Sequence, residues 1–202
     1  MDEGVEIVTR CVVRGEKLQS LVNLLSSLYG ASTEVDRFEE RLAFRPREEV
    51  GNMNYVNRDC LVAIQYSGND VLVTQRGSAS NANKDVKMPP NTEIYAVKQS
   101  KATNPNVRRT FLKAGFKVTG DFATKGLAFK TRSGFTITVA RPYNAALSDT
   151  MYGTGKSAWE SLSGAHPFGQ DYLLEVKRLV STQEEIDESV ESINQLLERF
   201  AI

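Results

Sequence analysis

The chain has 202 residues, of which 41% are hydrophobic and 25% charged, and its 25 basic residues balance its 25 acidic ones. These values are typical of a soluble globular protein, and no apolar run approaches the roughly 20 residues that a membrane-spanning helix needs. The first residues lack a basic stretch followed by an apolar one, so we expect no secretory signal. Cys11 and Cys60 lie in apolar segments, which favours buried free thiols over a disulfide.

The net charge of zero conceals an uneven distribution along the chain. Residues 98–141 contain ten basic residues and one acid, whereas residues 171–202 contain eight acids and three bases. The favoured interpretation is that the acidic segment faces the basic one within the fold, or that both are solvated surfaces. An acidic protein partner and, after it, a nucleic acid are the alternatives.

The first third of the chain predicts a strand, a helix and a second strand. Residues 5–14 alternate, so that one face of the strand carries Val5, Ile7, Thr9, Cys11 and Val13 and the other carries Glu6, Val8, Arg10 and Val12. Residues 16–29 predict an amphipathic helix that ends at Gly30, with an apolar stripe of Leu18, Leu21, Leu25 and Leu28. Residues 33–45 predict a long strand that Pro46 ends.

The middle of the chain predicts a hairpin between two mobile loops. A polar loop is expected near residues 47–58, and strands at 60–66 and 71–75 flank a turn. Residues 77–90 are small and polar, which predicts a second loop, and a strand follows at 92–97.

The last half predicts a helix, a long hairpin, a strand and a terminal helix. Asn106 is expected to cap a helix that ends at Gly115, and the hairpin turns at 131–134 and ends at Pro142. A third mobile loop is expected over 144–170, and a strand follows at 172–180. Thr182 and Glu185 form a capping-box pattern before a helix at 186–200. That helix is expected to dock on the barrel through Ile186, Val190, Ile193, Leu197 and Phe200, with a partner-binding face as the alternative.

Long antiparallel strands with few helices favour closure into a barrel, because closure removes the open sheet edges. We therefore predict one α+β domain over residues 1–202, a closed antiparallel β-barrel with flanking helices.

Two local motifs carry no site. Residues 153–157 resemble the end of a phosphate-binding loop, but Thr150 stands where the pattern needs glycine and the flanks are polar. His166 is the single histidine, and with two strand cysteines it cannot complete a structural zinc site or a hydrolase triad in the usual form.

Acidic and basic residues alternate on two predicted strands. Glu6 and Arg10 share a face of the first strand, and Glu175 and Lys177 lie two residues apart on the last. Such residues in a barrel lumen hold divalent cations only when several carboxylates converge, and the sequence supplies roughly two. A polar but inactive surface is the favoured interpretation. We assign no catalytic, metal-binding or cofactor-binding residue and expect no enzyme activity.

Trp159 and Phe168 are large apolar residues in the otherwise small and polar stretch of 144–170. They either pack against the barrel or bind a partner, because aromatic anchors in mobile loops often carry binding energy. We name both as candidate partner-binding residues.

Residues 111–143 carry a resemblance to a known family. The segments FLKAGF, DFATKGLAFK and FTITVARPY, followed by YLLEV and the terminal amphipathic helix, resemble the Mediator complex subunit 18 family, over most of the chain. The resemblance implies a closed barrel related to the tunnel-shaped, metal-dependent triphosphate enzymes. Those enzymes begin with Glu-x-Glu-x-Lys, and the corresponding positions here are Glu6, Val8 and Arg10, so the second carboxylate is missing.

The same resemblance implies a function and partners. It implies a non-enzymatic structural subunit of the Mediator head module, a nuclear coactivator that helps RNA polymerase II preinitiation complexes to assemble. The implied partners are Mediator subunit 20, as a heterodimer, and the C-terminal helix of Mediator subunit 8, with RNA polymerase II contacted indirectly or transiently. Neither a membrane nor a specific nucleic acid is expected as a partner. The alternative is a metal-dependent polyphosphate or RNA 5′-triphosphate hydrolase of the same fold.

Overall fold

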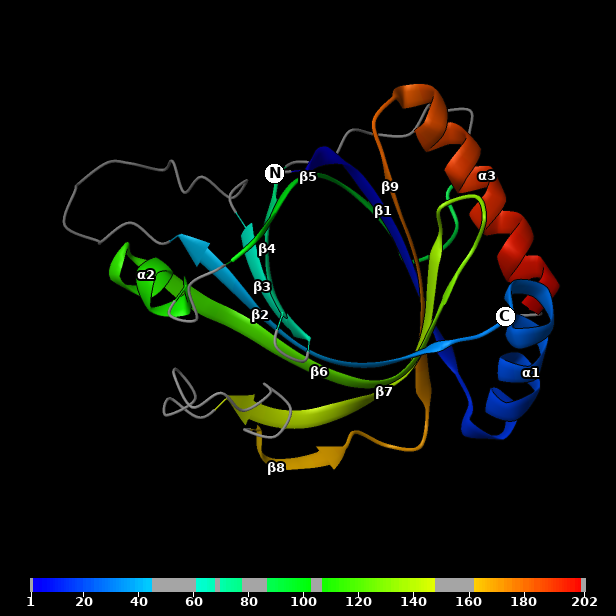
Figure 1. Cartoon of the computed structure of the whole chain (residues 1–202), viewed down its shortest axis with the longest axis horizontal. Coiled ribbons are helices and arrows are strands. Elements are labelled where there is room, and N and C mark those ends of the chain that lie inside the picture. Colours follow the sequence, from blue (N-terminus) through cyan, green and yellow to red (C-terminus); the bar gives the residue numbers. More distant parts are fainter. Residues whose placement is uncertain are drawn as a thin grey trace.

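One antiparallel sheet organises the computed structural model, which describes residues 2–44, 61–67, 70–77, 87–102, 107–147 and 162–200. Its strands follow the order β6, β2, β3, β4, β5, β1, β9, β7 and β8, and β6 also pairs with β7. The first eight strands of this order therefore close into a ring (Figure 1). The strands are β1 (Asp2–Val13), β2 (Thr33–Phe44), β3 (Leu61–Ser67), β4 (Asp70–Arg76), β5 (Thr92–Lys101), β6 (Phe116–Lys130), β7 (Thr136–Leu147), β8 (Leu162–Pro167) and β9 (Tyr172–Val180).

The alternation on β1 decides which side chains face outward and which face the lumen. β1 pairs with β5 along one edge and with β9 along the other. Ile7 and Val13 pack into an apolar cluster under the helices, whereas Glu6 and Arg10 form ion pairs with side chains of other strands. The two predicted faces of this strand are confirmed.

Two helices cover the outer face around β1 and β9. A short 3-10 turn, η1 (Gly15–Lys17), leads into α1 (Leu18–Tyr29), and α3 (Gln183–Phe200) lies next to it on the outside of the ring (Figure 1). The predicted stripe of α3 is buried in the apolar cluster at all five positions, so the predicted docking is confirmed: Ile186, Val190, Ile193, Leu197 and Phe200. On α1, Leu21 and Leu25 of the predicted apolar stripe are buried, whereas Leu28 is 46% exposed, so the stripe is not buried along its whole length.

The capping box before α3 is also confirmed. The backbone N–H of Glu185 donates to Thr182 Oγ1 at 3.2 Å, and Glu185 Oε2 accepts from the backbone N–H groups of Thr182 and Ser181 at 3.0 and 2.8 Å. These reciprocal bonds satisfy backbone donors that the first turn of a helix leaves unpaired.

A second apolar cluster lies on the other side of the ring, under α2 (Val107–Lys113). Phe38 and Leu42 of β2 are buried there, and Phe111 of α2 packs edge-on against Phe116 with 5.2 Å between ring centroids. Arg108 Nε donates to both oxygens of Glu40 at 2.9 and 2.8 Å, which fixes the helix to β2. The two clusters thus surround a lumen that is lined by the opposite faces of the same strands.

Closure of the ring between β6 and β7 depends on Gly126. A Cβ atom at this position would lie 2.1 Å from the carbonyl oxygen of Val139 and 2.5 Å from Cα of Ala140. Only glycine allows the two backbones to approach this closely.

Two predictions about the stretch after residue 140 were wrong. Pro142 does not end the strand, because β7 continues to Leu147, and the expected loop over 144–170 contains the end of β7 and all of β8. The carbonyl oxygen of Pro142 accepts a hydrogen bond from the N–H of Phe168. Along this edge of β7, Pro142 lies between Ala140, the last residue paired with β9, and Tyr143, the first residue paired with β8. Proline is tolerated there because no ladder bond needs its missing N–H.

Other predicted elements differ from the structure in length or lie outside the described residues. β5 continues to Lys101, beyond the expected end at residue 97. The expected loop near 47–58, most of the one at 77–90, Asn106 and Cys60 lie outside the described residues.

Cys11 is a free and partly buried thiol, and burial raises its pKa. No described helix has the length and apolar character needed to cross a bilayer.

Candidate functional site

Charged side chains from four strands meet in the lumen of the barrel. β1, β2, β4 and β9 each place alternate residues there, because their other faces pack under the helices. The ion-paired lumen residues are Glu6, Arg10, Arg37, Glu39, Arg41, Arg76, Glu175 and Lys177. We call this set the lumen network.

Glu175 lies between two guanidinium groups. Arg10 Nε donates to its Oε2 at 2.9 Å, and Arg37 Nη1 donates to its Oε1 at 3.0 Å. Burial pushes the pKa of Glu175 upward, but the charges of Arg37 and Arg10 and the hydrogen bond from Arg37 prevail and lower it from 4.5 to about 2. The carboxyl group is therefore ionised and paired on both oxygens. Arg10 also donates to Glu93 at 2.7 Å, which extends the network toward β5.

Glu6 is fully buried and contacts three side chains. Arg76 Nη2 donates to Oε1 at 3.1 Å, Gln99 Nε2 approaches Oε2 at 3.4 Å, and the ammonium group of Lys177 forms an ion pair with Oε2. Val8 faces Lys177 in the register between β1 and β9. The burial of Glu6 is tolerated only while these partners remain, because a buried charged group that loses its partner is costly.

Glu39 of β2 connects the network to the side of the barrel lined by β4. Arg41 Nε donates to Glu39 Oε1 at 3.1 Å, and Arg76 Nη1 lies 3.7 Å from the same oxygen. Burial raises the pKa of Glu39, but the charges of Arg76, Arg37 and Arg41 outweigh it and leave the pKa below its ordinary value. Arg76 thus bridges Glu39 and Glu6.

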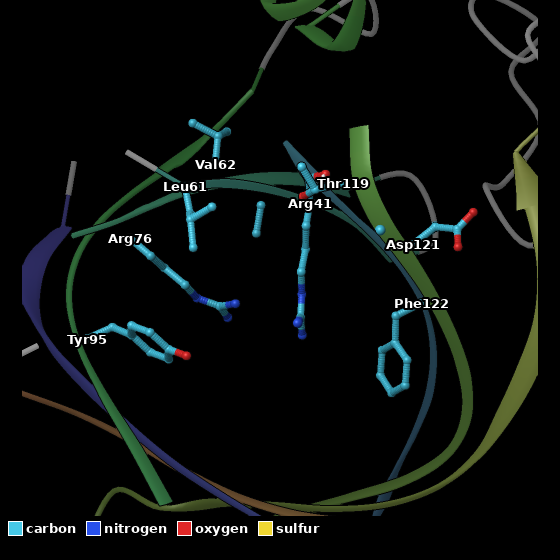
Figure 2. A pocket seen from close by; sticks show the side chains of 10 residues that line it. Arg41, Leu61, Val62, Arg76, Tyr95, Thr119, Asp121 and Phe122 are labelled. Carbon is cyan, nitrogen blue, oxygen red and sulfur yellow. Dashed lines mark hydrogen bonds between the residues drawn. The ribbon is translucent and has the colours of Figure 1, made fainter. Parts of the chain in front are cut away.

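A cavity of about 380 Å³ opens beside this bridge. Figure 2 shows Arg41, Arg76, Tyr95 and Phe122 pointing into the same space from different strands. The guanidinium carbon of Arg76 lies 5.4 Å from the ring centroid of Tyr95, and that of Arg37 lies 5.9 Å from the ring of Phe122. Cations and aromatic rings thus line this part of the cavity together with Asp121, and the nearby carboxylates of Glu6 and Glu39 have cationic partners.

The lumen does not fit the divalent metal that a tunnel-type triphosphatase would use. Glu6, Glu39 and Glu175 are each paired with arginine or lysine, and the fully buried Val8 occupies the position of the second carboxylate of the motif. In the described part of the chain, no three carboxylate, histidine or cysteine side chains come together as metal ligands would.

The sequence predicted part of this site. Glu6, Arg10, Glu175 and Lys177 all face the lumen, and the register opposes Arg10 and Glu175 directly. Sequence reasoning missed the contributions of β2 and β4: Arg37, Glu39, Arg41 and Arg76. A signal was present on β2: Phe38 and Leu42 share an apolar face, and the strand alternation places Arg37, Glu39 and Arg41 on the opposite face.

The candidate partner-binding residues lie away from the lumen network. Phe168 follows β8 and is 70% exposed, the largest exposure among the large hydrophobic side chains described. It does not pack against the barrel, which leaves the partner-binding alternative as a prediction. Trp159 lies outside the described residues, as do residues 153–157. His166 is exposed on β8.

No protein-family profile matches the sequence, and no curated protein matches it. Solved structures, in contrast, share the fold. A chain in the structure of the Schizosaccharomyces pombe Mediator head module has a TM-score of 0.67 and 16% identity, with 97% of this chain and 96% of that chain covered. The PH1819 protein from Pyrococcus horikoshii OT3 has a TM-score of 0.61 and 14% identity, with 98% and 90% covered.

A third similar structure is a putative adenylyl cyclase from Hippeastrum described as having a dominant triphosphatase activity. Its TM-score is 0.50 and its identity 11%, with 100% of this chain and 89% of that chain covered. At such low identities the likenesses establish the fold alone. The chain is a closed antiparallel β-barrel with flanking helices, and the prediction of this fold class is confirmed.

Proposed function

We propose that this chain is a non-enzymatic subunit of a nuclear Mediator head module, in which the barrel acts as a scaffold for assembly. The observation that carries the proposal is the whole-length likeness to a chain of that module, which covers 97% of one chain and 96% of the other. It agrees with the family resemblance of residues 111–143, which is independent of the structure. A subunit of this kind would help RNA polymerase II preinitiation complexes to form.

The lumen network supports the non-enzymatic part of the proposal. Catalysis through a metal needs carboxylates that are free to bind it, and Glu6, Glu39 and Glu175 each have a cationic partner. A network of this type keeps the barrel closed and charge-balanced. Its role is then structural, and binding is left to the outer surface.

The specific partners are part of the proposal and rest on the resemblance. They are Mediator subunit 20, as a heterodimer, and the C-terminal helix of subunit 8. Phe168, with its 70% exposure, is a candidate anchor for one of them, because exposed aromatic residues are enriched among interface hot spots.

Co-purification tests the assembly proposal. The chain is co-expressed with Mediator subunits 20 and 8 of the same organism, and the complex is isolated through a tag on subunit 20. We expect all three chains to elute together, and Phe168→Ala to weaken retention, whereas Leu179→Ala, a change at a 41% exposed leucine, should have no effect. Failure of the unmodified chain to co-elute would overturn the proposal.

A metal-dependent hydrolase is the second candidate, favoured by the fold and by Arg41 and Arg76 beside the cavity. Release of phosphate from tripolyphosphate with Mg²⁺ or Mn²⁺ tests it. We expect no release above the buffer blank. Turnover that Glu6→Gln abolishes would establish the hydrolase and refute the non-enzymatic proposal.

A further inference from the structure

A groove runs between α1, the end of β1 and the last turn of α3, on the outside of the barrel and away from the lumen network. Its volume is about 640 Å³. Val13, Leu21 and Phe200, which are buried members of the apolar cluster, line it together with Leu24 and with Val12, which lies on the other face of β1 from Val13. Val12 is 66% exposed and Leu24 37%. We call this feature the α1 groove. Grouped exposed apolar side chains around a hollow mark binding surfaces more often than scattered ones do.

The sequence of α1 shows that part of this apolar surface lies outside the stripe that packs on the barrel. Residues three, four and seven apart share a face of a helix. Leu18, Val22, Leu25 and Tyr29 form one stripe, and it packs in the cluster on the barrel. Leu24 and Leu28 form a second stripe beside Leu21, and they are 37% and 46% exposed. The helix therefore has one apolar face that packs on the barrel and, beside the buried Leu21, two leucines that the described part of the chain leaves partly exposed.

The rim of the α1 groove is basic. Arg14 and Lys17 line it and are exposed, and neither forms an ion pair with a carboxylate of the described residues. Glu16 lies between them in sequence and lines a second depression, which shares Arg14 with the groove and also contains Arg141 and Asp171. An apolar hollow with two unpaired cations at its edge is complementary to a segment that combines apolar side chains with carboxylates.

We propose that the α1 groove binds an acidic amphipathic segment of another protein, with its apolar side chains against Leu24 and Phe200 and its carboxylates toward Arg14 and Lys17. The proposal does not depend on the Mediator assignment, because it rests on this surface alone. A second copy of the chain fits less well, since a two-fold contact would bring two basic rims together. Two cations are too few for nucleic acid, and a concave surface offers no wedge to insert into a bilayer.

The test uses methyl NMR of the whole chain with two synthetic peptides, an amphipathic helix of leucine and glutamate and its leucine–lysine counterpart. We expect the acidic peptide to shift the methyl signals of Val12, Leu24 and Leu28. It should bind about tenfold more tightly than the lysine peptide, because two rim ion pairs differ in sign between them. No shift, or equal affinity for the two peptides, would overturn the proposal.

Matched variants locate the binding. Leu24→Gln should weaken the acidic peptide about tenfold, because it removes one apolar contact. Leu61→Gln, at a 39% exposed leucine on β3, should leave affinity unchanged. Lys17→Glu should reduce or reverse the preference between the peptides, and Lys113→Glu on α2 should not. Equal effects of a variant and its control would place the binding elsewhere and refute the proposal.

Other occupants give distinct outcomes, each of which counts against the proposal. Concentration-dependent dimerisation of the peptide-free chain that Leu24→Gln abolishes would assign the groove to a second copy. Acidic-peptide binding that appears only after deletion of residues 201–202 would assign it to the chain's own end. Binding to phosphatidylserine vesicles with no peptide binding would assign it to an anionic membrane. Because no Mediator subunit takes part, none of these outcomes bears on the assembly proposal.

Discussion

The outer and the lumen faces of the barrel strands are both buried, but they are stabilised in opposite ways. Ile7 and Glu6 are neighbours on β1, and both are fully buried. Ile7 faces outward into an apolar cluster under α1 and α3, where removal from water is favourable in itself. Glu6 faces the lumen, where its burial is tolerated only because Arg76 and Lys177 contact it.

The two faces should therefore respond differently to mutation. We call the outward-facing apolar clusters under the helices the apolar shell. In this shell each side chain stabilises the fold through its own burial, so the losses from several substitutions should add up. In the lumen network, a paired charge adds little net stability, yet loss of one member leaves its partner as an uncompensated buried charge. The same change in volume should therefore have different effects on the two faces.

The largest expected effect is in the apolar shell. Combining Ile193→Ala with Phe200→Ala should destabilise the fold, because truncating each buried side chain typically costs about 2–5 kcal/mol. Chemical denaturation measures the loss, and Leu179→Ala is the control because this leucine is 41% exposed. A double variant that keeps the parent's melting temperature yet fails to bind its partner would show that the α3 stripe is an interface.

Glu175→Gln should come next, with a loss of about 3–5 kcal/mol, because it leaves the largely buried Arg37 beside a neutral amide and leaves Arg10 with Glu93 alone. The change is nearly isosteric, so packing is not the cause. Glu191→Gln on the exposed side of α3 is the matched control and should be neutral. Equal stability of the two variants would mean that the lumen network is solvated and that the contrast between the faces is wrong.

A fall in pH should weaken the interactions of the lumen network before it affects those of the apolar shell. The pKa of Glu175 is lower in the folded chain than its ordinary value, so its contribution is complete above pH 4.5 and is lost as the pH falls toward about 2. The fall in pKa from 4.5 to about 2 corresponds to roughly 3 kcal/mol. The stability difference between the parent and Glu175→Gln should therefore shrink across this range. A difference that stays constant with pH would contradict the pairing.

The smallest expected effect is local and belongs to neither face. Thr182→Ala removes the acceptor for the N–H of Glu185 and should cost about 1 kcal/mol. Denaturant titration measures it, and Thr182→Ser should restore most of the loss. No change in Thr182→Ala would indicate that packing of the α3 stripe alone fixes the start of the helix.

The sequence by itself determined the features that lie within single segments. The alternation of Glu6, Ile7 and Val8 predicted the two faces of β1, and the spacing of Ile186, Val190 and Ile193 predicted how α3 docks. Thr182 and Glu185 predicted the cap of that helix. Such features are local, because the period of a strand or helix and the geometry of a cap depend only on neighbours in the chain.

Only the tertiary structure decided which charges meet. Arg37 and Glu175 are 138 residues apart, and their contact depends on the register of several strands around the ring. Tertiary structure also decided two local features. β7 continues through Pro142 because the missing N–H of this residue lies between the segments paired with β9 and with β8. Leu28 lies on the predicted stripe of α1 but remains partly exposed. Periodicity assigns a side chain to a face, but the partner on that face is set by strand pairing across long separations.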